Sequence, residues 1–162
     1  YSASSGIGFG AFYPGRFRAS FQSKSSTVAY ALQLVFEEIR KIRETPVTEE
    51  ELVTIKNNII QTFPSNFESK AQQAGTFAAD EYTKRDPLYW STYRDRIQAV
   101  TAADVQRVAK QYLVPEKLIT LVVGNQLEIS KGDGKHDVTL EKLSGGKITE
   151  LSLRDPMTMR RK

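Results

Sequence analysis

The chain has 162 residues, of which 40% are hydrophobic and 10% aromatic, so we expect one packed domain with a tail rather than a disordered chain. The net charge of +4 is small. The basic residues lie at the end of the chain and in helical segments that also carry acidic residues, and this distribution does not favour nucleic-acid binding. The absence of cysteine excludes disulfides and thiolate metal sites, and no apolar run is long enough to span a bilayer.

Residues 1–23 are predicted to form two strands joined by a turn at Pro14-Gly15. Apolar and small residues alternate before the turn, and a second alternation follows it, in which Arg16 and Arg18 lie on the polar face. We expect these two arginines to face solvent or a partner. Three glycines form a G-x-G-x-G run in the first strand, where we expect bends, bulges or close approach of another chain rather than a phosphate site: Gly6, Gly8 and Gly10.

A block of helices is predicted next. Apolar residues recur every three or four positions from Val28 to Ile42, which is typical of an amphipathic helix, and Pro46 ends it. Thr48 and Glu51 form a predicted capping box, after which four residues are expected to face inward: Leu52, Ile55, Ile59 and Phe63. Pro64 is expected to kink or end that helix.

Further helices are predicted through residues 71–82 and 88–100, the second with Tyr89, Trp90 and Tyr93 at helical spacing, which indicates a core or domain interface. Thr101 and Asp104 are expected to cap a helix that ends before Pro115, with four inward residues: Val105, Val108, Ala109 and Tyr112. The apolar run 118–123 is predicted to be a buried strand.

These elements predict an α+β fold: a two-layer arrangement in which a mixed or antiparallel sheet is covered on one face by several helices. We expect a main domain over residues 1–125. Residues 126–162, rich in Gly-containing turns, are expected to be a peripheral tail of loops and short strands, the strands lying near residues 138–140 and 148–153.

Three segments in series resemble the pitrilysin/insulinase-type zinc metallopeptidases, in particular their processing-peptidase-like branch. Residues 100–125, VTAADVQRVAKQYLVPEKLITLVVGN, are similar to the capped helix, proline turn and strand that close each domain of that family. Residues 46–69, PVTEEELVTIKNNIIQTFPSNFES, resemble a helix pair of the family, and YSASSGIGFGAFYPGRFRASFQS at the start resembles strands of a C-terminal half domain.

The resemblance implies a peptidase in two halves, one of which holds zinc through an H-x-x-E-H motif while the other lacks metal and completes the substrate chamber. This chain has a single histidine, His136, in a polar Gly-rich loop, so we expect no metal site and no catalysis in this chain alone. We expect His136 to be a solvated surface residue. Zinc is expected in a partner domain, in the same polypeptide or in a separate subunit.

By the same resemblance, Tyr1 is the expected substrate-binding residue, whose hydroxyl would reach the carbonyl of the bound peptide; its partner arginine would precede Tyr1. Exposed apolar surface for the partner is expected, and with it self-association of the isolated chain. Relatives in this branch are bacterial proteins of the periplasm or membrane, which we favour, or mitochondrial proteins. The alternative is a structural homologue that serves as a scaffold, like the core subunits of respiratory complex III, with no peptidase partner.

Overall fold

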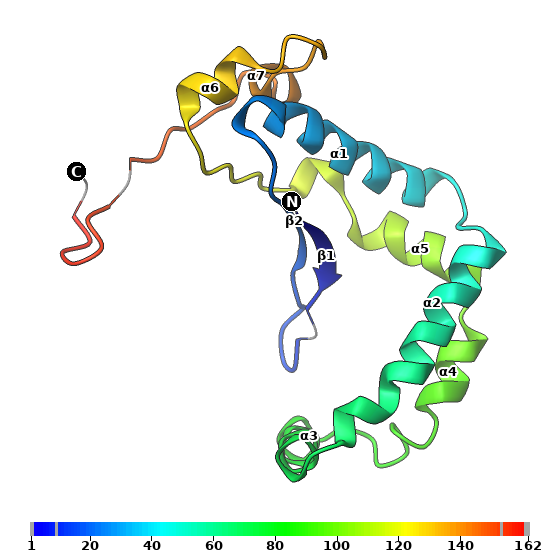
Figure 1. The fold of residues 1–162 in the computed structure, drawn as a ribbon. Helices are drawn as coiled ribbons and strands as arrows, with labels where there is room; N and C mark the ends of the chain where they lie inside the picture. The colour runs from blue at the N-terminus through cyan, green and yellow to red at the C-terminus, as the bar shows by residue number, and fades with distance from the viewer. Residues whose placement is uncertain (1, 9, 153, 161–162) are drawn as a thin grey trace. The chain divides into compact units, whose positions relative to one another are not determined.

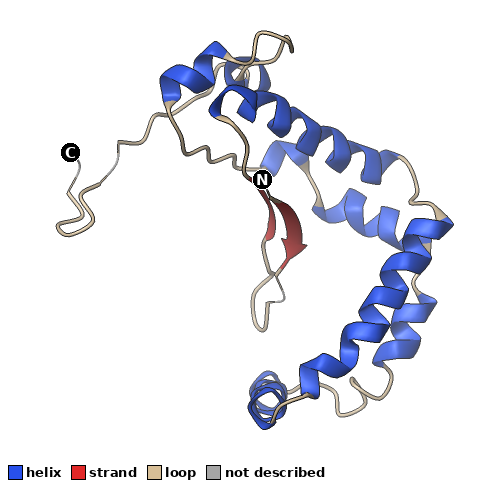
Figure 2. Ribbon diagram, in the orientation of Figure 1, coloured by secondary structure: helices blue, strands red, loops and turns tan. Residues whose placement is uncertain are grey.

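The computed structural model describes residues 2–8, 10–152 and 154–160, and it confirms the α+β class. Two strands, β1 (Ala3–Ile7) and β2 (Phe17–Phe21), form an antiparallel hairpin, and helices make up most of the rest of the described chain (Figures 1 and 2). The helices are α1 (Val28–Glu44), α2 (Glu49–Thr62), α3 (Lys70–Thr83), α4 (Tyr93–Ala99), α5 (Ala102–Tyr112), α6 (Gln126–Lys131) and α7 (Leu140–Ser144). Among the described residues no helix combines the length and the apolar character that a membrane span requires.

The chain divides into two compact units. The helical unit comprises the described residues of Ser4–Ser20 and Glu37–Ile119, and the terminal unit comprises Phe21–Phe36, the described part of Thr120–Lys162 and residues 2–3. Each unit has a small core. In the helical unit Ile39, Leu52, Ala109 and Leu113 are buried, and in the terminal unit Ala29, Leu32, Ile129 and Val138 are buried.

Sequence signals for helix ends are confirmed in the helical unit. The Thr48 hydroxyl accepts the N–H of Glu51, whose carboxylate accepts the N–H of Thr48, which is the predicted capping box of α2. The helix ends at Thr62, and Pro64 lies in the 3₁₀ turn Phe63–Phe67 that follows. A proline cannot donate the next helical hydrogen bond, so the chain leaves the α-helix there.

Within the helical unit, α2 packs beside α4, and α3 packs on the 3₁₀ turn after α2 (Figure 1). The helix predicted over residues 88–100 is shorter than expected, because hydrogen-bonded turns replace it before Tyr93. The predicted inward positions of Ile55 and Tyr112 are wrong, since these side chains are 57% and 63% exposed. Heptad-like spacing shows which residues share a helix face, whereas burial depends on whether another element covers that face.

The predicted buried strand at residues 118–123 is wrong. The segment forms no strand, and three of its side chains are largely exposed: Ile119 at 96%, Leu121 at 74% and Val123 at 83%. A strand needs a neighbour for its backbone N–H and C=O groups, and the one sheet of the described residues consists of β1 and β2 alone. An apolar run specifies a strand only where such a neighbour exists.

The terminal unit differs from the predicted strand-and-loop tail. No strand forms at 138–140 or at the described residues of 148–153, and the tail contains the two short helices α6 and α7 instead. Asn125 caps α6 by accepting the N–H groups of Leu127 and Glu128, and Thr139 caps α7 by accepting the N–H of Lys142. Such caps satisfy donors that a helix start leaves free, which favours helices over isolated strands here.

Candidate functional site

An apolar groove of about 490 Å³ runs along α5 in the helical unit. Its floor and walls come from three elements: Ile7 of β1, Ile42 of α1, and the stretch from Val100 to Leu113. The apolar and aromatic α5 residues that line it are Val105, Val108, Ala109 and Tyr112, the four positions that the sequence predicted to share one face. Among these, Ala109 is buried and Tyr112 is largely exposed. The predicted face therefore exists, but it is a surface groove for part of its length.

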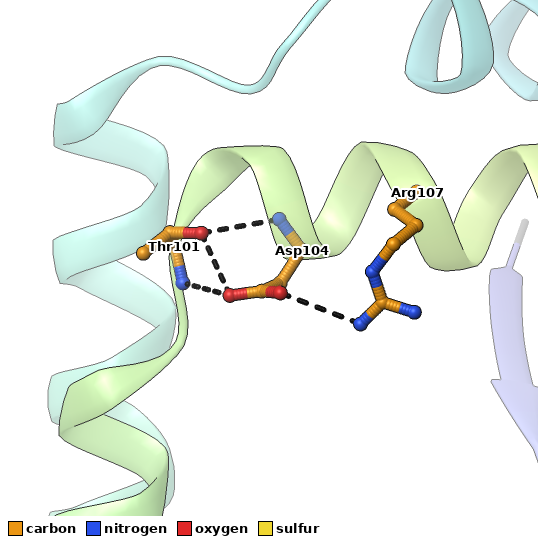
Figure 3. Close-up of polar contacts among 3 residues, drawn as sticks. All are labelled: Thr101, Asp104 and Arg107. Atoms are coloured by element: carbon orange, nitrogen blue, oxygen red, sulfur yellow. Dashed lines mark hydrogen bonds and ion pairs between the residues drawn. The ribbon is translucent and has the colours of Figure 1, made fainter.

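The start of α5 is fixed by a second capping box (Figure 3). The Thr101 hydroxyl accepts the N–H of Asp104 at 3.1 Å, and the Asp104 carboxylate accepts the N–H of Thr101 at 3.1 Å and its hydroxyl at 2.7 Å. The other carboxylate oxygen of Asp104 lies 3.3 Å from the Arg107 guanidinium. The Thr101 hydroxyl, the Thr101 N–H and Arg107, in that order, hold the pKa of Asp104 below its ordinary value.

The box places a carboxylate and a guanidinium at the edge of the groove. Asp104 and Arg107 are among its lining residues, while the remainder of the lining is apolar. Their side chains are 46% and 65% exposed, so the ion pair lies in water rather than in the groove's interior. An apolar centre with a charged rim is the composition of a protein–protein contact surface.

The three aromatic residues predicted to share a helical face come together in a second cluster of the helical unit. Trp90 and Tyr93 pack against Phe63, with ring centroids 5.9 and 4.9 Å away, and Tyr89 packs on Trp90 at 4.8 Å. Phe67 joins the same cluster edge-on to Trp90 at 5.4 Å. The cluster thus joins the end of α2 to the start of α4, a packing role.

A carboxylate fixes this aromatic cluster from one side. The indole N–H of Trp90 donates to Asp80 at 2.5 Å, and the other Asp80 oxygen pairs with the Arg85 guanidinium at 2.6 Å. Arg85 also lies over the Tyr89 ring, 4.3 Å from its centroid. A guanidinium that both pairs with a carboxylate and stacks on an aromatic ring is held in one geometry. The sequence interpretation missed Asp80 and Arg85, which no local spacing singles out.

His136 lies in the terminal unit and is an exposed surface residue, which confirms the prediction, and its ring also makes two specific contacts. Its Nδ1 is 2.7 Å from Asp133, and its ring stacks on Tyr30 of α1 with centroids 3.6 Å apart. Asp133 also accepts the N–H groups of Lys135 and His136, each at 3.0 Å. The His136 N–H, the His136 ring and the Lys135 N–H, in that order, lower the pKa of Asp133. The D-x-x-H spacing was visible in the sequence, whereas the Tyr30 stack was not.

The other predicted residues lie as follows. Arg16 and Arg18 are exposed, in agreement with the prediction. Gly10 serves a close approach, because a Cβ there would lie 1.5 Å from the Tyr13 carbonyl oxygen. Tyr1, the expected substrate-binding residue, lies outside the described residues.

The described residues contain no group of three or more His, Cys, Asp and Glu side chains arranged to hold a metal ion. The comparisons with known proteins add no assignment: no family model matches the sequence, and no curated protein is significantly similar to it.

Proposed function

We propose that this chain is the metal-free C-terminal half of a two-part zinc metalloendopeptidase of the pitrilysin/insulinase type, in its processing-peptidase-like branch. In this role it clasps a zinc-bearing peptidase domain and closes the chamber around the peptide substrate. Support comes from three sequence segments that resemble the family in the right order, and from the presence of only one histidine. Two histidines and a glutamate between them are what the zinc motif requires.

The observation that carries the proposal is the apolar groove along α5. Its lining side chains Val105 and Val108 lie at one helical face, and the Asp104–Arg107 pair marks its edge. Large exposed apolar patches on a protein surface mark places where a partner binds. The exposed side chains of Ile119, Leu121 and Val123 add further apolar surface to the chain.

The resemblance implies separate roles for this chain and its partner. The partner would supply zinc, which activates water for attack on the peptide carbonyl. This chain would supply apolar surface that binds the partner and encloses the peptide. By resemblance, the Tyr1 hydroxyl would donate a hydrogen bond to the carbonyl oxygen as negative charge develops there.

The test is reconstitution. This 162-residue chain is purified and its zinc is quantified. It is then mixed with the separately purified peptidase domain that carries H-x-x-E-H, whether that domain is encoded in the same gene or in a neighbouring one. We expect no stoichiometric zinc and no cleavage from this chain alone, and cleavage of a quenched fluorescent peptide from the mixture. One zinc per chain, or cleavage without the partner, would contradict the proposal.

A matched pair of variants on α5 ties the result to the groove. Val108→Glu places a charge in the groove, whereas Gln111→Glu places the same charge on an exposed position of α5 that does not line it. We expect the first variant to abolish complex formation and the second to leave it unchanged. If the complex forms but the partner is equally active alone, the chain is a scaffold like the core subunits of complex III.

A further inference from the structure

The register of the β1–β2 hairpin follows from two contacts. The Gly8 N–H donates to the Arg16 carbonyl at 3.0 Å, and the hydroxyls of Ser4 and Ser20 lie 3.0 Å apart. Both pairs fit one register, in which residue n of β1 faces residue 24 − n of β2. Ser5 therefore faces Ala19.

This register defines the free edge of β2. In an antiparallel pair, opposed residues alternate between those that exchange hydrogen bonds and those whose N–H and C=O groups point away from the partner strand. Because Arg16 bonds to Gly8, the alternation makes Phe17, Ala19 and Phe21 the β2 residues whose N–H and C=O groups point away from β1. The register keeps the N–H and C=O groups of Phe17 and Ala19 out of the ladder with β1, and among the described residues no turn or loop segment forms a backbone hydrogen bond with either residue.

The same edge carries positive charge. Side chains alternate between the two faces of a strand, so Arg16 and Arg18 share one face, and Phe17 and Ala19 share the other. Both arginines are exposed, and neither has an ion-pair partner among the described residues. β1 contains no charged residue at any of its five positions, so its outer edge lacks such a positive face.

We propose that the outer edge of β2 binds an extended peptide segment with acidic side chains at alternate positions. The peptide's backbone pairs with the free groups of Phe17 and Ala19 and adds a third strand to the sheet. Its acidic side chains lie on the face of Arg16 and Arg18, where opposite charges on neighbouring strands attract. A two-stranded hairpin is marginally stable alone, and a third strand stabilises it.

The charge pattern disfavours a second copy of this chain as the occupant. Antiparallel pairing of two β2 edges would bring Arg16 and Arg18 of one chain beside the same arginines of the other on one face of the sheet. Like charges on neighbouring strands destabilise the pair. The proposal does not depend on a zinc-bearing partner, since it requires only an acidic extended segment.

The test uses fluorescence anisotropy with the full chain and two labelled peptides, a Glu-Val repeat and a Lys-Val repeat. We expect binding of the Glu-Val peptide only. Reversing both arginines, Arg16→Glu with Arg18→Glu, should weaken its binding by about tenfold and create binding of the Lys-Val peptide. Added salt should weaken the wild-type interaction.

Two proline variants on one rung of the hairpin test the edge itself. Ala19→Pro removes the outward N–H of β2, and Ser5→Pro removes that of β1 directly opposite. We expect the first to weaken peptide binding by about tenfold or more and the second to leave it within about twofold. Circular dichroism checks that both variants fold, and the charge-reversal variants, which change no backbone group, decide the question if either proline variant unfolds.

Three results would overturn the proposal. The first is equal binding of the two peptides, and the second is unchanged peptide preference after charge reversal. The third is self-association of the chain that Ala19→Pro abolishes, because the edge would then be occupied by a second copy.

Discussion

Replacing Thr101 with alanine should destabilise the helical unit by about 1 kcal/mol, the usual cost of losing a threonine N-cap. The Thr101 hydroxyl is the acceptor for the Asp104 N–H and also donates to the Asp104 carboxylate at 2.7 Å. Alanine keeps the backbone and removes both contacts. Since α5 supplies one wall of the groove and buries Ala109 and Leu113, the loss should appear in the unfolding of the whole unit.

The matched control is Thr92→Ala. Thr92 occupies the N-cap position of α4, where its hydroxyl accepts no capping hydrogen bond and donates instead to the Leu88 carbonyl at 2.8 Å. The control therefore removes one exposed side-chain contact but no cap, and we expect it to cost about half as much as Thr101→Ala, roughly 0.5 kcal/mol. Urea unfolding followed by circular dichroism measures both variants. Equal losses in the two variants would show that the capping box contributes nothing and would refute the reasoning.

The same box predicts a pH dependence. The pKa of Asp104 lies below its unfolded value, first because the Thr101 hydroxyl donates to its carboxylate. A carboxyl with a lowered folded-state pKa stabilises the fold above its unfolded pKa of about 3.9, and this contribution is lost as the pH falls through the folded-state pKa. The Thr101→Ala variant should lose less stability than the wild type between neutral pH and pH 3. A parallel fall in both proteins would contradict this assignment.

Three further predictions concern other elements. Gly75→Ala in α3 should stabilise the protein by roughly 0.5–1 kcal/mol, because the added Cβ meets no atom within 4 Å. Gly145→Ala should destabilise it by about 1 kcal/mol, because Gly145 has φ +61°. Opposite shifts in melting temperature test the pair. Leu113→Ala should cost about 2–4 kcal/mol in urea unfolding, since Leu113 is 9% exposed. Asp133→Asn replaces a carboxyl whose pKa is lowered first by the His136 N–H, so the stability that this carboxyl contributes above about pH 4 should disappear. The NMR signals of Tyr30 should shift as the His136 stack loosens, and unchanged signals would contradict the assignment.

Signals that act within one turn of helix were predictable from the sequence. The boxes at Thr48 and Thr101 were expected and are present, because an N-cap side chain and the residue three positions later meet through local geometry alone. The end of α2 before Pro64 follows from the missing proline N–H, again a local effect. The α+β class follows from the order of these elements.

Faces and partners were less predictable, because they depend on residues far apart in the sequence. Ile55 fits an apolar stripe but is exposed, and Tyr112 lines an open groove. The stack of His136 on Tyr30 joins residues far apart in the sequence, and the pairing of Arg85 with Asp80, although the two are close in sequence, has no periodic signature. The α5 face was predicted residue by residue, yet the sequence could not show that this face would remain partly uncovered.

The exposed residues 119, 121 and 123 connect the fold to the proposed function. An apolar run with no charge has the composition of a buried strand, and yet these three side chains are the most exposed part of it. Burying such side chains contributes roughly 1.5–3 kcal/mol each, so a surface that covered them would gain several kcal/mol. If a partner domain covers them, hydrogen exchange at residues 119–123 should be fast in the chain alone and slow in the complex. Fast exchange in both would place the partner elsewhere and leave the groove along α5 as the surface that binds it.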